Sequence, residues 1–440
     1  MLLFYIINIS ISIIFLIISI YLLFNNNKIY YNIYISFNIL IFIIIFKNNF
    51  NNISYLLILL SNFLIIICFT LIPENIKFKK ELSFSLFLLL YILIMLFYTN
   101  NLIIFFIFFE LSLIPLFIII GIWGYGKNKI IASIYFMLFT ISSSFLMFVC
   151  ILQIYNLTGT FNINFLSTLV LPTSLQCNCI IGFFICFAVK IPLVPFHIWL
   201  PRAHVEAPLI GSVLLAGILI KLGGYGIIKI IIPLFPYGLE YYSNLFILLS
   251  LISIIYGGLC TLRQTDIKKL IAYSSVSHMG GVCLGLFCYN YIGIYSSIII
   301  MISHGLVSSG LFIIAGFLYS RFNTRNINYY RGLETNMPLL SLFSFLLLIA
   351  NFSFPLSLNF IGELLLLYCT LKVNIIITIL ASIGGLITLI YSIQLYNKLF
   401  NGIISPYLIN IRDLSRKESY ILISLIIIIF ILGIFPNWLI

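Results

Sequence analysis

Long apolar stretches separated by short polar connections repeat along almost the whole 440-residue chain. A membrane-spanning helix needs about 20 predominantly apolar residues, and stretches of this length follow one another from end to end. We therefore predict an all-α membrane protein with about 14 transmembrane helices and almost no chain left for a soluble domain. The predicted helices begin near Leu2, Ile29, Ile53, Leu82, Leu102, Lys129, Leu175, Glu206, Tyr241, Lys268, Tyr291, Pro338, Val373 and Ser419.

Composition agrees with this pattern, because 63% of the residues are apolar, 7% are charged and the mean hydropathy is +1.24. The distribution of the net charge of +12 along the chain indicates how the chain is oriented in the membrane. Most of the 22 basic residues fall in alternate connections, whereas Lys190 and Lys221 lie within predicted spans. The positive-inside rule then places both termini away from the basic compartment. We expect no nucleic-acid partner.

Targeting and redox signals are mostly missing from the sequence. The first apolar stretch lacks the basic region and small-residue cleavage site of a signal peptide. An abundance of Ile, Phe, Asn, Tyr and Lys is typical of an AT-rich genome, which suggests synthesis inside an organelle. The nine cysteines show no metal-ligand spacing and lie largely in apolar runs. We expect structural thiols, with no iron–sulfur or haem site.

Ionisable residues inside apolar stretches are costly and usually mark ion or proton paths. Glu110, Lys190 and Lys221 all lie within predicted spans. We interpret Glu110 and Lys190 as a functional pair, in which each charge compensates for the other within the membrane. A static ion pair that only fixes helix packing is an alternative. For Lys221 the alternative is a side chain that extends to the membrane surface.

Two histidines lie in serine-rich spans, in SSVSH ending at His278 and in SHGLVSS around His304. Imidazole exchanges protons near neutral pH, and the neighbouring hydroxyls can hold ordered water. Each histidine alone could instead be a simple hydrogen bond between helices. Glu363 is a further membrane carboxylate. Glu206 is a secondary candidate that could equally stabilise the first turn of a helix. His197 and His204 are also secondary.

Prolines interrupt two apolar segments beside ionisable residues. Pro192 and Pro195 follow Lys190, and Pro355 precedes Glu363. Paired broken helices in separate parts of a membrane protein are typical of inverted repeats with an ion site near the bilayer midplane. We therefore predict broken helices near Lys190 and Glu363.

The stretch from Lys190 to Pro208, KIPLVPFHIWLPRAHVEAP, resembles the proton-conducting membrane subunits of respiratory complex I and the related Mrp cation/proton antiporters. Three further motifs are similar to the subunit 4 branch of the NADH:ubiquinone oxidoreductase family. The resemblance covers about residues 101–400. The three motifs are ELSLIPL from Glu110, AYSSVSHM from Ala272 and NFIGE ending at Glu363.

The resemblance implies two inverted five-helix repeats, and we assign N-terminal helices to 1–81, the repeats to 82–235 and 236–400, and a loop and last helix to 401–440. It also implies a role for each matching residue. Glu110 and Lys190 would be a coupling pair, Lys221 a central relay, His278 and His304 bridging groups, and Glu363 the distal residue. The sequence departs from the expected pattern at Pro355-Leu356, where two adjacent prolines are expected.

The resemblance further implies that NADH, FMN, iron–sulfur clusters and ubiquinone bind to partner subunits, with no cofactor on this chain. Expected partners are other membrane-arm subunits of complex I, especially adjacent antiporter-like subunits, and membrane lipids. The expected location is the mitochondrial inner membrane, with an organelle-encoded chain and both termini on the intermembrane-space side. An Mrp-type cation/proton antiporter subunit is the main alternative, and an inert membrane scaffold is a third.

Overall fold

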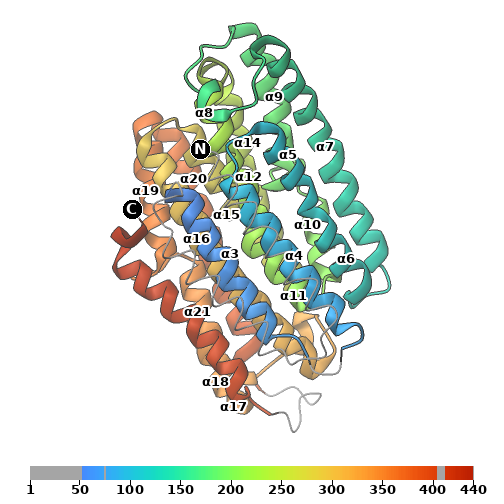
Figure 1. The fold of residues 1–440 in the computed structure, drawn as a ribbon. Helices are drawn as coiled ribbons and strands as arrows, with labels where there is room; N and C mark the ends of the chain where they lie inside the picture. The colour runs from blue at the N-terminus through green and yellow to red at the C-terminus, as the bar shows by residue number, and fades with distance from the viewer. Residues whose placement is uncertain (1–51, 74–75, 404–411, 440) are drawn as a thin grey trace.

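The computed structural model describes residues 52–73, 76–403 and 412–439, and these form a bundle of helices without a named strand (Figure 1). Eleven helical segments in this part are long and apolar enough to cross a membrane. They are Asn52–Thr70 (α3), Lys79–Tyr98 (α4), Leu102–Trp123 (α5 and α6), Lys129–Thr158 (α7), Thr173–Lys190 (α9), Leu209–Leu234 (α11 to α13), Pro236–Leu262 (α14), Ile267–Phe287 (α15), Tyr291–Phe322 (α16), Ile375–Phe400 (α20) and Arg416–Ile434 (α21).

These eleven segments correspond to eleven of the fourteen predicted spans. The first two predicted spans, near Leu2 and Ile29, lie outside the described residues. The span predicted near Pro338 is present as two shorter helices, Pro338–Asn351 (α18) and Leu358–Val373 (α19). Short helices fill several connections. They are Ile163–Leu166 (α8), Trp199–Glu206 (α10), Ile327–Tyr329 (η4) and Leu333–Asn336 (α17), and a further short helix, Pro436–Leu439 (η5), follows α21.

Both predicted helix breaks are confirmed. Helix α9 ends at Lys190, and residues 191–198 follow an irregular path before α10 begins. Helices α18 and α19 are separated by residues 352–357, which include Pro355. Proline lacks a backbone N–H and clashes with the preceding helical turn, so each apolar segment is interrupted at these residues.

A third interruption is not predicted from the sequence. Two π-helical segments, Leu215–Leu219 (η2) and Ile227–Ile231 (η3), flank the short helix Ile220–Gly226 (α12). The helix before them is Leu209–Leu214 (α11), and Ile232–Leu234 (α13) follows. π-Helical bulges are rare and occur frequently at functional sites.

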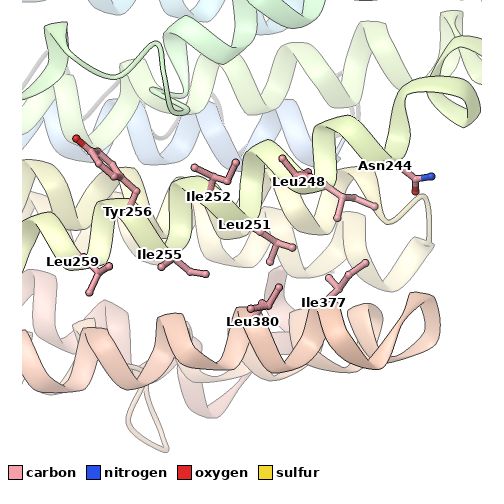
Figure 2. A pocket seen from close by; sticks show the side chains of 10 residues that line it. Asn244, Leu248, Leu251, Ile252, Ile255, Tyr256, Leu259, Ile377 and Leu380 are labelled. Atoms are coloured by element: carbon pink, nitrogen blue, oxygen red, sulfur yellow. The ribbon is translucent and has the colours of Figure 1, made fainter.

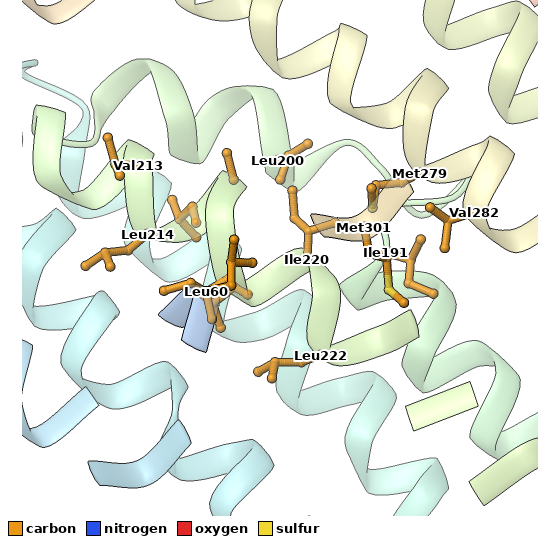
Figure 3. Packing of buried hydrophobic residues seen from close by; sticks show 14 of the residues in the cluster. Leu60, Ile191, Leu200, Val213, Leu214, Ile220, Leu222, Met279, Val282 and Met301 are labelled. Carbon is orange, nitrogen blue, oxygen red and sulfur yellow. The ribbon is translucent and has the colours of Figure 1, made fainter. Parts of the chain in front are cut away.

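The centre of the bundle is formed by α11 to α13, α15 and α16. In an 18-residue apolar stretch of each of these three spans, 83%, 94% and 100% of the residues are buried, respectively. Apolar side chains from several helices pack around α12 here, including Leu60, Ile191, Met279 and Met301 (Figure 3). Close packing continues where Gly223 lies against α9, because a Cβ there would lie 2.9 Å from the carbonyl oxygen of Phe187. Buried groups on these central helices are therefore cut off from bulk water.

The outer helices present apolar side chains at the surface, as expected for a protein surrounded by lipid. Helix α7 runs along one edge of the bundle (Figure 1) and exposes Leu138 and Phe145. A groove of about 520 Å³ lies between α14 and α20 and is lined mainly by apolar residues such as Leu248, Ile252 and Leu380 (Figure 2).

Candidate functional site

Lys190 is the last residue of α9 and is 1% exposed. Its Nζ has no hydrogen-bond partner among the described residues and lies 4.5 Å from the centre of the Phe109 ring. The chain beyond it is fixed by the indole of Trp199, which donates a 2.9 Å hydrogen bond to the carbonyl of Val189. The helix break therefore leaves a buried amine against an aromatic face, where a cation is favourable.

Glu110 lies one residue before the end of Leu102–Leu111 (α5), and the chain continues from Ser112 into Leu113–Trp123 (α6). The carboxylate is within electrostatic range of Lys190 and beside Ser144. No ion pair joins Glu110 to Lys190 in the part of the chain that the structure describes, and Oε1 of Glu110 is buried without a partner. The predicted coupling pair is therefore close together but not in direct contact.

Lys221 lies on α12 and is fully buried. The π-helical turn before it pairs the N–H of Ile220 with the carbonyl of Leu215, five residues earlier. The carbonyl of Ala216 accepts a hydrogen bond from Lys221 Nζ. The same Nζ lies 3.0 Å from Nδ1 of His304 on α16. When Lys221 is protonated it can only donate, and in that state His304 accepts at Nδ1 and, if neutral, carries its proton on Nε2.

His278 on α15 continues this row of polar groups. The rings of His278 and His304 have centroids 5.6 Å apart. Nδ1 of His278 lies 3.4 Å from Oε1 of Glu363 on α19, and Nε2 lies 3.4 Å from the hydroxyl of Tyr391 on α20. Each ring nitrogen thus faces a group that exchanges or shares a proton. Lys221, His304, His278 and Glu363, which come from four different helices, form one row.

The row has neighbours that the sequence did not single out. The amide of Asn351 donates a 3.1 Å hydrogen bond to Tyr391. Asn359 hydrogen-bonds to Ser303 and donates to the carbonyl of Ala350 at 2.8 Å. Both asparagines border the break between α18 and α19, where backbone carbonyls lose their helical partners. The sequence could have identified the two asparagines by their position beside a proline break. It offered no such sign for Tyr391, which lies in an apolar helix.

Glu206 is the last residue of α10, not a residue in the first turn of the next helix. The helix-stabilising alternative is therefore wrong, because a carboxylate at a helix C-terminus meets the negative end of the helix dipole. Its carboxylate packs against Gly126, where a Cβ would lie 1.5 Å from Oε2. Lys268 lies within electrostatic range of Glu206 and donates a 2.7 Å hydrogen bond to the carbonyl of Ala207.

His204 on α10 lies within electrostatic range of both Lys268 and the central Lys221. The side chain is fully buried, stacks on Phe312 with centroids 4.5 Å apart, and has no hydrogen-bond partner at either nitrogen among the described residues. Burial, together with the charges of Lys268 and Lys221, lowers the pKa of His204 to about 3. His204 is therefore neutral at physiological pH. His197 lies in the preceding loop, and its ring is near those of Tyr256 and Tyr273.

Comparison with known proteins places this bundle of broken helices and buried ionisable groups in a class of membrane transport subunits. Residues 99–388 match the family described as NADH:quinone oxidoreductase/Mrp antiporter, transmembrane. The chain belongs to this family.

Individual relatives within the family narrow the comparison to one kind of subunit. The chain is 46% identical over 372 residues to NADH-ubiquinone oxidoreductase chain 4 of Metridium senile, covering 84% of this chain and 76% of the relative. It is 45% identical to chain 4 of Chondrus crispus, covering 86% and 77%. It is 39% identical to NADH-quinone oxidoreductase subunit M of Rickettsia prowazekii, again covering 86% and 77%.

Solved structures of membrane complexes contain chains with a similar fold. A chain of respiratory complex I from Thermus thermophilus superposes with a TM-score of 0.82 at 28% identity, covering 88% of this chain and 82% of that chain. A chain of the Mrp complex from Dietzia sp. gives a TM-score of 0.79 at 19% identity, with the same coverage of both chains. The second likeness establishes the fold alone.

Proposed function

We propose that this chain is a proton-translocating membrane subunit of NADH:ubiquinone oxidoreductase. The family membership and the names of its relatives support this function. The observation that carries it is the contact between Lys221 and His304, because two proton-exchanging groups meet there on central, buried helices. A buried lysine shifts its proton affinity readily and is suited to proton transfer.

The proposed route runs from Lys190 to Lys221, on to His304 and His278, and ends near Glu363. The second half is supported by the 3.0 Å and 3.4 Å contacts along the row. The first half needs water, since Lys190 and Glu110 have buried polar atoms without protein partners and such atoms are normally satisfied by water.

Glu110 is proposed to control the charge of Lys190. An opposite charge nearby favours the protonated amine, and its withdrawal favours release of the proton. In the structure the two side chains interact at a distance without forming an ion pair. Closing and opening this gap would change the proton affinity of Lys190, which is the step that we propose responds to electron transfer in other subunits.

The remaining assignments follow from the same proposal. NADH, FMN, iron–sulfur clusters and ubiquinone would be bound by partner subunits, and the neighbours would be other antiporter-like membrane-arm subunits and lipid. The membrane would be the mitochondrial inner membrane, with both termini on the intermembrane-space side. The divisions at 81, 235 and 400 would separate the N-terminal helices, two inverted repeats and the C-terminal segment.

The first test is to find the assembly that contains the chain. Gently solubilised membranes are separated by native electrophoresis, stained for NADH oxidation and searched for its peptides by mass spectrometry. Recovery in a large NADH-oxidising band supports the proposal. Recovery only in a smaller particle without NADH activity favours the Mrp-type antiporter, and sodium-dependent proton flux would then be measured.

The second test addresses the route itself. The purified assembly is reconstituted in vesicles, and the ratio of protons moved to NADH oxidised is measured for Lys190→Ala and Glu110→Gln. The proposal expects a lower ratio in both variants. An unchanged ratio in both would support the inert-scaffold alternative.

A further inference from the structure

Two connections that are far apart in the sequence meet at the basic side of the bundle. The indole Nε1 of Trp123, the last residue of α6, donates a 2.9 Å hydrogen bond to the carbonyl of Lys77, 46 residues earlier. Lys129, the first residue of α7, donates a 2.6 Å hydrogen bond to the carbonyl of Ile122. These bonds fix the start of α4 beside the end of α6 and the start of α7, at the lower right of the bundle in Figure 1.

Five lysines are gathered by this arrangement, and we call them the lysine cluster: Lys77, Lys79, Lys80, Lys127 and Lys129. Three of them, Lys77, Lys80 and Lys127, have exposed side chains. With Glu74 and Glu81 counted, and with Glu206, whose carboxylate packs against Gly126, the group still carries a net charge of +2. None of the five lysines forms an ion pair with a described carboxylate, so their charges are available to a ligand.

The depth of the lysine cluster is fixed by Trp123. Indole rings of membrane proteins are enriched at the level of the lipid headgroups. Because Trp123 is hydrogen-bonded to the lysine-bearing segment, that segment lies at the same level. Groups of basic residues directly outside a transmembrane helix, and basic pockets between helices, bind anionic headgroups.

An apolar surface begins directly beside the cluster. Along the first half of α7, Ile130, Ile134 and Leu138 point outward, with 59%, 44% and 62% of their surfaces exposed. Their spacing of four residues puts them on one face of the helix. Positive charge at headgroup level, continued by an apolar stripe toward the membrane centre, is complementary to a phosphate group with acyl chains.

We propose that the lysine cluster and the adjoining face of α7 form a binding site for an anionic phospholipid. The phosphate would contact the lysine ammonium groups, and the acyl chains would lie along Ile130, Ile134 and Leu138. The site shares no residue with the row formed by Lys221, His304, His278 and Glu363, so it can be tested separately from the proton route proposed above.

The test uses the intact solubilised assembly in nanodiscs of phosphatidylcholine containing a small fraction of a photo-crosslinkable phosphatidylglycerol. Crosslinked peptides are identified by mass spectrometry, and the same experiment is repeated with a photo-crosslinkable phosphatidylcholine. The proposal expects the anionic probe to label the peptides around 76–81 and 127–138 more strongly than the neutral probe does. It also expects this preference to shrink as the salt concentration rises.

Charge removal provides the decisive comparison. The double variant Lys77→Gln and Lys127→Gln should lower labelling by the anionic probe about tenfold, since each lysine near a charged headgroup contributes appreciably. The matched control is Lys398→Gln with Lys417→Gln, which removes two exposed lysines elsewhere on the basic connections and should leave this labelling unchanged.

Three results would overturn the proposal. Equal labelling by the anionic and neutral probes would show an ordinary lipid-facing surface. Full competition by millimolar inorganic phosphate, but not by chloride at equal ionic strength, would identify free phosphate as the ligand. Crosslinking of these peptides to a neighbouring subunit, with no lipid adduct, would show a protein interface.

Discussion

Nζ of Lys221 lies 3.0 Å from Nδ1 of His304, and this contact joins α12 to α16 at the centre of the bundle. The lysine is fully buried and His304 is 2% exposed. An amine and an imidazole that share a hydrogen bond away from water can pass a proton directly between them. The structure shows a contact between helices, and the proposed proton route gives it a second role as a link for protons.

Substitutions of Lys221 test whether this residue transfers protons or only joins two helices. Both Lys221→Ala and Lys221→Arg should lower the ratio of protons moved to NADH oxidised to below about one tenth of wild type, since arginine keeps the charge but does not release its proton. The ratio is measured in vesicles, with the exposed Lys398→Ala as control. Normal pumping by Lys221→Arg would show that only the positive charge matters.

Glu363→Gln should also reduce proton translocation. The amide keeps the shape of the side chain and a hydrogen bond to His278, which lies 3.4 Å from the carboxylate, but it does not take up a proton. Glu334→Gln is the matched control, because Glu334 is an exposed glutamate elsewhere in the chain. Equal pumping ratios for the two variants would remove Glu363 from the route.

An ion pair should help to hold the C-terminal helix against the bundle. Arg321 on α16 lies 2.6 Å from Glu418 on α21 and also donates to the carbonyl of Asp413 at 3.3 Å. Both side chains are mostly buried, so a double-mutant cycle with Arg321→Ala and Glu418→Gln should give a coupling of about 1–3 kcal/mol. Thermal stability of the assembly is measured, with exposed Arg416→Ala as control. Additive effects of the two substitutions would contradict the prediction.

His204 should make the stability of the protein depend on pH. Its pKa is about 3 in the folded protein and about 6.5 when unfolded. Between these values the unfolded chain binds one more proton, so stability falls as pH falls below about 6.5. The loss approaches about 1.4 kcal/mol per pH unit. His204→Gln should have a flatter profile of thermal midpoint between pH 7 and 5. Parallel profiles would show that folding does not lower the pKa of His204.

The helices and the ionisable residues within them were predictable from the sequence. Apolar length alone defines a span, and a charge inside such a span stands out because hydrocarbon does not solvate it. The breaks after Lys190 and before Glu363 were predictable as well, since proline cannot continue a helix. The π-helical turns around Lys221 were not, because no residue type marks them.

The sequence by itself determined which groups would be buried in the membrane, because burial there follows from the length and composition of each span. Only the tertiary structure decided which of them meet. Lys221 and His304 are 83 residues apart in the chain, and their contact depends on how α12 and α16 are rotated and shifted against each other. Glu110 and Lys190 show the opposite case, where a pairing suggested by charge is left open by the packing of α5 against α9. Side-chain packing sets these rotations and shifts, and no periodicity along the chain records them.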